Sequence, residues 1–373
     1  MIVSDAYFLY NEEQILTQLN TLKAAFPDFC IFYSAKTNPH HEVLKTLIEH
    51  GCGIDAASAQ EVMRAKGLGL KSGMISYSAP GKTEEDIESA LGSCTIVADS
   101  FTELRRLNDA ACRIGRICDV GIRFNPGKLA SQFGISPDEF LEKLPVFNWL
   151  RIIGIHCHEK SQILDAERLA EYFERVFRIA KRLTDIGYPI QFINFGSGFG
   201  VSYGDETPLN IGLLSRNVKH LIEKYQFQRK IQLIIEPGRF LVSKAGVYRT
   251  KIIDKKTSNG TTFLIASGGL SGFVRPCFAE TGGLGEPLYS GNHPSEITVL
   301  NSSSEIERVT VTGNLCSAYD VFARNILLKK AEIGDFLEFS HAGAYGYTLS
   351  FSRFAGARTP KEYFRKTDGN IVE

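Results

Sequence analysis

The feature that most constrains this chain is a regular alternation of short apolar runs with helix-forming segments. Most of the runs are almost continuously apolar, which is typical of parallel strands that are buried on both faces. Eight strand–helix units in succession predict an α/β fold built on a (β/α)8 TIM barrel. A doubly wound open sheet is the alternative that the same pattern allows. The eight runs lie at residues 30–34, 52–56, 73–78, 95–99, 119–124, 152–157, 191–195 and 232–236.

The segments between the runs carry the start signals of helices. Ser58 with Glu61, and Ser100 with Glu103, have the spacing of a capping box. Pro39 suits the first position of a helix, because the missing N–H of proline costs nothing there. These signals predict helices after the apolar runs, as the barrel requires.

The pattern changes after about residue 250. Before this point, residues 163–187 have the apolar spacing of a long amphipathic helix. After it, short strand-like segments follow one another with polar turns and no long helix between them. A β-rich C-terminal portion is therefore predicted, with strands at residues 247–256, 261–269, 296–301, 308–313 and 335–347.

Composition narrows the class of protein. The 42 basic and 42 acidic residues give no net charge and form no basic stripe, so we expect no nucleic-acid partner. The eight cysteines include no CxxC pair, which indicates reduced thiols and predicts a cytoplasmic protein. No apolar run is long enough to span a bilayer, and the first residues lack the pattern of a signal peptide.

A lysine stands at the end of the first apolar run. In a TIM barrel the active site is built at the carboxyl ends of the strands. Burying the ammonium of Lys36 is costly, so an amine whose pKa is lowered by burial and which forms a Schiff base is one interpretation. A lysine that reaches the surface from a strand end is the alternative. Other polar residues end runs at the same predicted mouth, namely Asp55, Arg123, Asn125, His156 and His158.

Two loops at the predicted mouth suit an anion. The sequence GSGFG at 196–200 follows the seventh run, where TIM barrels often bind phosphate, and glycines let backbone N–H groups approach an anion. Gly238 and Arg239 follow the eighth run and would add two donors. Ordinary structural turns are the alternative for both loops.

Glu236 closes the eighth run, where an unpaired carboxylate would be costly. A protonated pyridine nitrogen would satisfy it, and an ion pair with Arg123 or Arg239 is the alternative. The ring of His158 suits stacking on a flat cofactor. His156 and His158 share a strand face and could ligate a metal together, but no third ligand has sensible spacing, so we expect no metal site.

Eight motifs follow one another along the chain, namely YSAKTN, IDAASAQEV, IRFNP, HCHEKSQ, INFGSGFG, EPGRFLV, GNLCSAYD and GAYGYTLSFSRFAG. Together they resemble those of the fold-type III decarboxylases that use pyridoxal 5′-phosphate (PLP), the ornithine/arginine and diaminopimelate decarboxylases with an alanine-racemase-like barrel. The resemblance implies PLP as cofactor, a barrel over residues 22–248, and a β-sandwich or β-barrel-like domain from residues 1–21 and 249–373. It also implies a homodimer with shared active sites.

The resemblance assigns roles to individual residues. Lys36 resembles the Schiff-base lysine, His158 the ring-stacking histidine and Glu236 the partner of the pyridine nitrogen. Cys316 resembles a cysteine that enters the partner subunit's site and protonates Cα after CO₂ departs. The implied cofactor contacts also include Asp55, Arg123, Ser161, Gly196, Ser197, Gly198, Phe199, Gly200, Gly238, Arg239 and Tyr345.

The chain departs from the family's pattern mainly at substrate-facing positions. Ser317 stands where an acid is usual, and Ser197 where the loop usually has glycine. Arg275, Glu280, Ser317 and Asp320 are the expected substrate contacts. The changes favour an amino acid, or a biosynthetic intermediate with its own carboxylate, over a simple diamino acid. A racemase of the same fold and a non-catalytic PLP-binding homologue are the alternatives, and Glu236 favours decarboxylation over racemisation.

Overall fold

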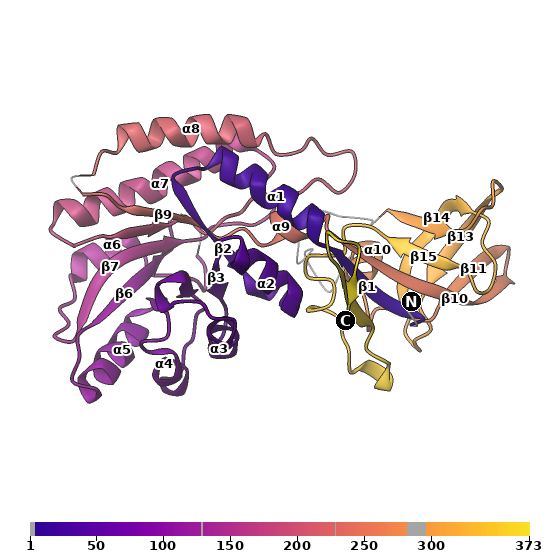
Figure 1. Cartoon of the computed structure of the whole chain (residues 1–373), viewed down its shortest axis with the longest axis horizontal. Helices are drawn as coiled ribbons and strands as arrows, with labels where there is room; N and C mark the ends of the chain where they lie inside the picture. Colours follow the sequence, from indigo (N-terminus) through magenta and orange to yellow (C-terminus); the bar gives the residue numbers. More distant parts are fainter. Residues whose placement is uncertain (1–3, 128–129, 228, 282–295) are drawn as a thin grey trace.

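A computed structural model describes residues 4–127, 130–227, 229–281 and 296–373 of the chain. Figure 1 shows two parts side by side, a barrel wrapped by helices and a twisted β-sheet. The chain begins in the sheet, runs through the barrel and returns to the sheet for its last third. The predicted barrel and the predicted β-rich portion are both confirmed.

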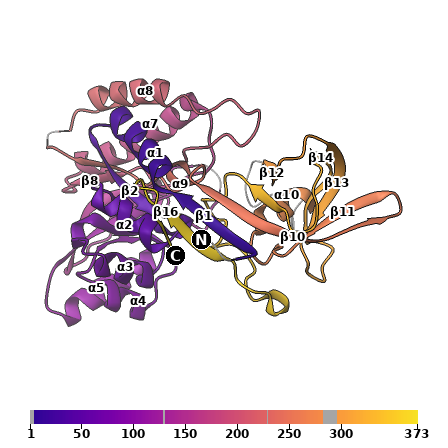
Figure 2. The same cartoon turned by 45° about the vertical axis from the view of Figure 1, so that its right-hand side comes forward.

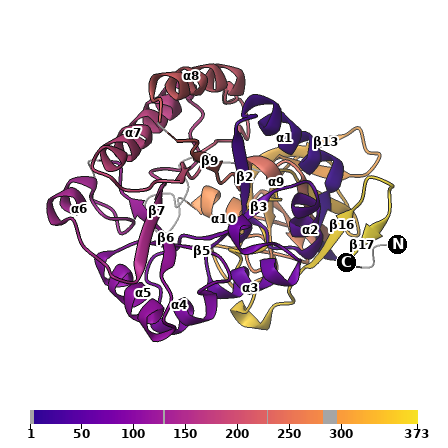
Figure 3. The same cartoon turned by 60° about the vertical axis from the view of Figure 1, so that its left-hand side comes forward.

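The barrel is closed and all its strands are parallel, since β2 pairs with β3 on one side and with β9 on the other. Figure 3 shows the strands in the centre and the helices around them. Each predicted apolar run forms one strand, with bounds that differ from the prediction by one or two residues. The strands are β2 (Phe29–Ser34), β3 (Gly53–Ala56), β4 (Ile75–Tyr77), β5 (Thr95–Ala98), β6 (Cys118–Phe124), β7 (Leu150–Cys157), β8 (Phe192–Asn194) and β9 (Gln232–Ile235).

Two aromatic rings and glycines fill the inside of the barrel. Phe32 and Phe192 form a small buried cluster with Ile234. A Cβ on Gly154 would lie 2.2 Å from the ring of Phe192, and a Cβ on Gly53 would lie 2.7 Å from the ring of Phe32. Glycine on these strands therefore makes room for the rings. The barrel interior is a packed core, and polar chemistry is left to its ends.

The helices of the barrel part start largely where the sequence indicates. They are α1 (Glu12–Ala25), α2 (His41–Glu49), α3 (Ala59–Gly67), α4 (Glu84–Ala90), α5 (Phe101–Arg113), α6 (Pro137–Lys143), α7 (Ala166–Asp185), α8 (Ile211–Lys224) and the short α9 (Arg239–Val242). Two 3₁₀ turns, η1 (Ala35–Thr37) and η2 (Ser72–Met74), complete the part. The amphipathic helix predicted at 163–187 is α7.

All three of the predicted helix starts differ in detail. Ser100 accepts from the N–H of Glu103, but the Glu103 carboxylate accepts from the N–H of Asp99 rather than that of Ser100. Ser58 accepts from the N–H of Glu61, but the Glu61 carboxylate reaches the N–H of Ala57 rather than that of Ser58. Pro39 does not begin a helix, because α2 starts at His41. The preceding residues form η1 instead, and the Asn38 side chain is bound to the carbonyl of Gly343. The prediction for Pro39 was therefore wrong.

The second part is a mixed nine-stranded sheet within the described residues. Figure 2 shows its N-terminal strand beside a strand from the C-terminus, and these two pair in parallel. Both chain ends thus enter one sheet. Its strands are β1 (Ala6–Asn11), β10 (Gly246–Ser258), β11 (Thr261–Ala266), β12 (Ile297–Leu300), β13 (Ile306–Thr312), β14 (Val321–Lys329), β15 (Phe336–Phe339), β16 (Lys361–Arg365) and β17 (Ile371–Val372).

Some of these elements have no counterpart among the strands predicted from the sequence. No strand was predicted for β14, and the segment predicted at 335–347 is a strand only over β15. One short helix, α10 (Val274–Thr281), interrupts the strands. The predicted domain boundaries fall inside α1 and close to the start of β10, and the division at those residues stays a prediction.

The two parts meet at the mouth of the barrel. The N–H of Tyr345 donates to the carbonyl of Thr37 in η1 at 2.8 Å, and the Asn38 amide donates to Gly343 at 3.0 Å. The segment after β15 is therefore fixed to the turn that carries Lys36. Among the described residues, no helix combines the length and the apolar character needed to cross a bilayer.

Candidate active site

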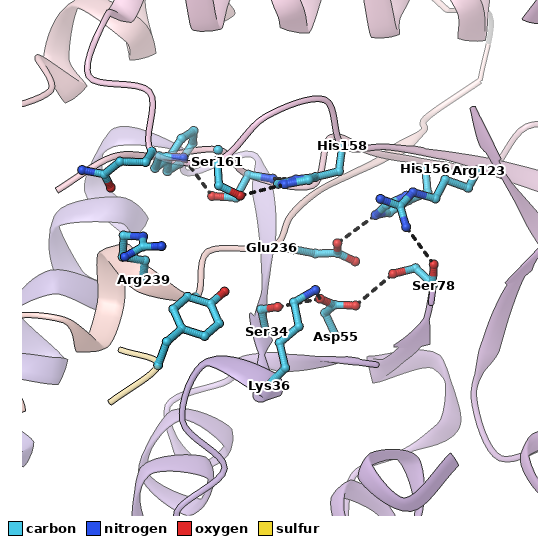
Figure 4. Close-up of a pocket in the computed structure, with 16 residues that line it drawn as sticks. Ser34, Lys36, Asp55, Ser78, Arg123, His156, His158, Ser161, Glu236 and Arg239 are labelled. Atoms are coloured by element: carbon cyan, nitrogen blue, oxygen red, sulfur yellow. Dashed lines mark hydrogen bonds and ion pairs between the residues drawn. The ribbon is translucent and has the colours of Figure 1, made fainter. Parts of the chain in front are cut away.

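A cavity opens at the carboxyl ends of the barrel strands. The space inside it is about 610 Å³, with open solvent at its mouth included. Figure 4 shows its polar side chains pointing toward one another. The predicted site residues that line it are Lys36, Asp55, Arg123, His158, Ser161, Ser197, Gly198, Phe199, Glu236, Gly238, Arg239 and Tyr345. The lining residues not predicted as contacts are Ser34, Ser78, His156 and Gln162.

Lys36 lies in η1, directly after β2, and its Nζ is 4.0 Å from Oδ2 of Asp55. Its side chain is 52% exposed, because it faces the cavity and a second hollow beside Glu61 and Tyr345. Burial lowers the pKa of the amine, but the charges of Asp55, Tyr345 and Glu236 together raise it above its ordinary value. The predicted lowering of the Lys36 pKa is therefore wrong for the protein without a ligand, and the amine is a cation there.

Asp55 ends β3 and is almost completely buried. Its carboxylate accepts from the hydroxyl of Ser34 at 2.8 Å and from that of Ser78 at 3.1 Å. Burial, and then the charge of Glu236, raise its pKa above the ordinary value for an aspartate. The two hydroxyls thus fix the carboxyl group of Asp55 beside the amine of Lys36, where it can exchange protons with the amine.

Glu236 lies in the middle of the cavity wall in Figure 4. Its Oε1 accepts from Nδ2 of Asn194 at 2.5 Å, and its Oε2 is 2.9 Å from Nε2 of His156. Burial raises the pKa of Glu236, chiefly by removing water from the charged form. A cation at the cavity would stabilise this carboxylate. The alternative of a direct ion pair with Arg123 or Arg239 was wrong, because these two neutral partners hold it.

His156 and Arg123 form the wall beyond Glu236. Burial, and then the charge of Arg123, lower the pKa of His156 far below its ordinary value, so the ring is neutral and Nε2 donates to Glu236. Arg123 donates to the carbonyl of Ser78 and lies 3.6 Å from Asp99. The Nε of Arg123 is buried without a partner, which suits a ligand acceptor.

His158 presents a neutral ring to the cavity. Its Nε2 is 3.1 Å from the hydroxyl of Ser161, and its Nδ1 accepts from the N–H of Ser197 at 3.5 Å. Burial, and then the charge of Lys36, lower its pKa to about 3. A neutral ring fixed at both nitrogens suits stacking on a flat aromatic ligand. Among the described residues, no group of three His, Cys, Asp or Glu side chains is arranged to hold a metal ion.

The glycine-rich loop packs too tightly for side chains. Gly196 and Gly198 have positive φ, and a Cβ on either would lie 2.6 Å from a backbone oxygen. The ring of Phe199 turns away and stacks on Phe26 in the core, so it anchors the loop. Gly196 and Gly200 shape the loop but do not line the cavity. Ser197, in the position usually held by glycine, accepts from the N–H of Phe199.

Gly238, Arg239 and Tyr345 also line the cavity. A Cβ on Gly238 would lie 2.1 Å from Oγ1 of Thr37, so only glycine lets the chain pass the η1 turn. The guanidinium of Arg239 lies 5.1 Å from the centre of the Tyr345 ring. These groups, with Ser161 and Ser197, place a cation, hydroxyls and a glycine loop at one end of the cavity. This donor set fits a phosphate group.

The other predicted site residues lie outside the cavity. Cys316 is exposed in the loop between β13 and β14, and Ser317 lies beside it. Asp320 is buried and accepts from the N–H groups of Leu270 and Leu315. Arg275 donates to the carbonyl of Ala344. Glu280 belongs to α10, but its side chain lies outside the part of the chain that the structure describes.

The cavity thus joins a lysine amine, an aromatic stacking ring, a buried carboxylate and a phosphate-binding end. This combination defines a barrel enzyme that binds a pyridine aldehyde phosphate, and the groups fit PLP in polarity and arrangement. The family model for the pyridoxal-binding domain of pyridoxal-dependent decarboxylases matches residues 12–243. The chain therefore belongs to this family. It is a PLP-dependent amino-acid carboxy-lyase, as the resemblance of its motifs predicted.

Relatives and solved structures extend over most of the chain. Diaminopimelate decarboxylase of Zymomonas mobilis is 30% identical, over 86% of this chain and 77% of its own. The L-glutamyl-[BtrI acyl-carrier protein] decarboxylase of Niallia circulans is 29% identical, over 96% and 88%. The crystal structure of Helicobacter pylori diaminopimelate decarboxylase with L-lysine superposes with a TM-score of 0.87 and 27% identity, over 99% and 93%.

Proposed function

We propose that the chain removes the α-carboxylate of an amino-acid-derived substrate that bears a further carboxylate, and that Lys36 holds the cofactor. The observation that carries the proposal is the convergence of Lys36, Glu236 and the phosphate-binding end on one cavity. PLP, when bound, supplies an electron sink for the bond that breaks. The following paragraphs derive what the residues of this chain contribute.

Glu236 tunes the electron sink. Its carboxylate is oriented from both oxygens by Asn194 and His156, so it does not need to reorganise when a ligand enters. It faces the cavity and favours a protonated ring nitrogen over a neutral one. His156 stays neutral, so it does not compete as a cation for the same carboxylate.

Lys36 and Asp55 handle protons at the opposite side of the cavity. Lys36 must give up a proton before its amine is a nucleophile, because its pKa is raised in the protein without ligand. The carboxylate of Asp55, 4.0 Å away, is placed to receive that proton. The hydroxyls of Ser34 and Ser78 fix Asp55 in this position.

The cofactor is held at its two ends and its face. Arg239, Tyr345, Ser161 and the loop around Ser197 would bind the phosphate. The ring of His158 would stack on the pyridine face. Because both nitrogens of His158 are engaged, the ring cannot swing out of the cavity without losing two contacts.

Cys316 would complete the site of a second copy of the chain. The loop that carries Cys316 is held in place by Asp320, because the carboxylate of Asp320 accepts hydrogen bonds from the N–H groups of Leu270 and Leu315. Cys316 is exposed on this loop and does not line the cavity of its own chain. A two-fold homodimer would let each subunit lend a thiol that protonates Cα after CO₂ leaves.

The substrate class rests on Ser317 and Arg275. The hydroxyl of Ser317 accepts from the N–H of Tyr319, so the loop presents a neutral group beside Cys316, where an acid would favour a distal amine. The guanidinium of Arg275 donates to the carbonyl of Ala344, which places a positive charge near Tyr345. One relative named above acts on a glutamyl group and others on diaminopimelate, which both fit a substrate with a second acidic or acyl group.

The test is release of CO₂ from a panel of substrates with saturating PLP. The panel pairs meso-diaminopimelate and L-glutamyl derivatives with lysine, ornithine and arginine, each in L and D form where both exist. We expect turnover of a member with a further carboxylate or acyl group and little turnover of the simple diamino acids. Faster decarboxylation of ornithine or lysine would refute the proposed substrate class, and racemisation without CO₂ would refute the proposed reaction.

A further inference from the structure

A buried tyrosine outside the predicted site lies behind the phosphate-binding end of the cavity. Tyr203 follows the glycine-rich loop and is only 4% exposed. Its hydroxyl oxygen accepts from Nη1 of Arg239 at 2.8 Å and from the hydroxyl of Ser243 at 3.0 Å. The ring of His341 packs against it edge-on, with 5.4 Å between ring centres. The phenol is therefore fixed from several sides.

The two donors come from the two ends of one short helix. Arg239 is the first residue of α9, and Ser243 is the residue that caps its C-terminus. The phenol oxygen of Tyr203 thus binds residues at both ends of α9 and fixes the Arg239 guanidinium relative to this helix. The bond to Tyr203 sets the direction in which the remaining N–H groups of Arg239 point. Since Arg239 lines the cavity, this bond also decides how these groups meet a ligand there.

The face of the same ring meets a second arginine. The guanidinium of Arg275, from α10 of the sheet part, lies 5.3 Å from the centre of the Tyr203 ring, and that of Arg239 lies 6.0 Å from it. An aromatic ring near two cations lessens their mutual repulsion by cation–π attraction. Burial raises the pKa of the phenol, but Arg275 and Arg239 outweigh it, so the pKa lies below its ordinary value.

We propose that Tyr203 is a positioning residue that aims Arg239 at the phosphate of the cofactor through its hydroxyl and, through its ring, holds Arg275 beside the segment of Ala344 and Tyr345. This inference rests on the proposed role of Arg239 as a phosphate ligand. It separates two functions of one side chain. The hydroxyl affects the binding of an anionic cofactor, and the ring affects the substrate side.

The test compares the dissociation constants of PLP and of pyridoxal, which lacks the phosphate, by equilibrium dialysis against the apoenzyme. In Tyr203→Phe, the Kd for PLP should rise about three- to tenfold, the scale of one hydrogen bond, while the Kd for pyridoxal stays unchanged. Ser243→Ala removes only the second donor and should raise the Kd for PLP about twofold with the same selectivity. Tyr203→Leu also removes the ring, so the KM of the substrate should rise at saturating PLP.

Tyr10→Phe is the matched control. Tyr10 is a buried tyrosine whose hydroxyl binds Glu362, and it does not line the cavity. It should bind PLP and pyridoxal as the wild type does. If Tyr203→Phe and Ser243→Ala bind PLP as tightly as the wild type, or lose PLP and pyridoxal equally, the inference is wrong. If the wild type itself does not bind PLP, the proposed function fails instead.

Discussion

Replacing Glu236 by glutamine removes one negative charge and keeps the shape of the side chain. The glutamine oxygen can still accept from Asn194, which leaves the new amide facing Nε2 of His156. His156 is neutral, so its proton can move from Nε2 to Nδ1, and Nε2 then accepts from the amide. No donor is left facing another donor, and we expect the variant to fold.

The stability change follows from the same contacts. Nδ1 of His156 is buried without a partner, so its new N–H costs about 1–3 kcal/mol. Removing a buried carboxylate whose pKa is raised by burial offsets part of this cost. The free energy of unfolding should therefore fall by less than about 3 kcal/mol.

The effect on turnover is larger. A buried charge-assisted hydrogen bond is worth about 1.5–3 kcal/mol, which corresponds to roughly a ten- to over a hundredfold loss of kcat if it is felt fully in the transition state. The assay is CO₂ release at saturating PLP, with cofactor content measured in the same sample. Glu362→Gln is the control, because Glu362 accepts from Tyr10 away from the cavity, and its kcat should stay at the wild-type value. An unchanged kcat in Glu236→Gln with bound PLP would show that Glu236 has only a structural role.

Three further predictions concern the dimer, the substrate and the acid stability. Mixing the inactive variants Lys36→Ala and Cys316→Ala under subunit exchange should restore activity toward roughly a quarter of wild type, since half of the dimers are mixed and each carries one intact site; no recovery after proven exchange would refute a shared site. Ser317→Asp should lower turnover of the native substrate and shift preference toward diamino acids, because it adds an anion for a distal amine; an unaltered preference over the panel would place Ser317 outside the pocket. Burial lowers the pKa of His40 to about 4, so below pH 6.5 the unfolded chain binds a proton that the folded chain does not, and stability is lost as the pH falls. His40→Phe keeps the ring against Phe364 and should retain up to about 3 kcal/mol more of its pH 7 stability at pH 4, measured by urea unfolding, whereas an identical pH dependence would contradict this origin.

Local patterns identified the barrel because each strand is short, apolar and followed by a helix start. They missed β14, which alternates only weakly and is defined by pairing with β13. They also failed at Pro39, since α2 begins only at His41, after Asn38 has bound both the N–H of His40 and the carbonyl of Gly343, some 300 residues later. No local pattern carries a contact of this kind.

Lys36, Asp55 and Glu236 were identified by their positions at strand ends, whereas Ser161 and Tyr345 were assigned only by the resemblance of their motifs. The hydrogen-bond partners of Glu236 were not predicted, although their positions on the strands could have indicated them. His156 and Asn194 are direct neighbours across β7 and β8, so they reach the same edge of the barrel as Glu236. The direction of the Lys36 pKa could not be predicted, since it depends on the distances to Asp55 and Glu236. Tyr203 had no signal beyond its nearness to the glycine loop.

The central claim is that Lys36 holds the cofactor, and chemical trapping tests it most directly. Purified protein saturated with PLP should absorb visible light, and reduction with borohydride should fix the cofactor to the peptide that contains Lys36. Lys82, a buried lysine paired with Glu103, is an internal control and should stay unlabelled. We expect label on Lys36 alone. Label on another lysine, or no retained cofactor at saturating PLP, would contradict it.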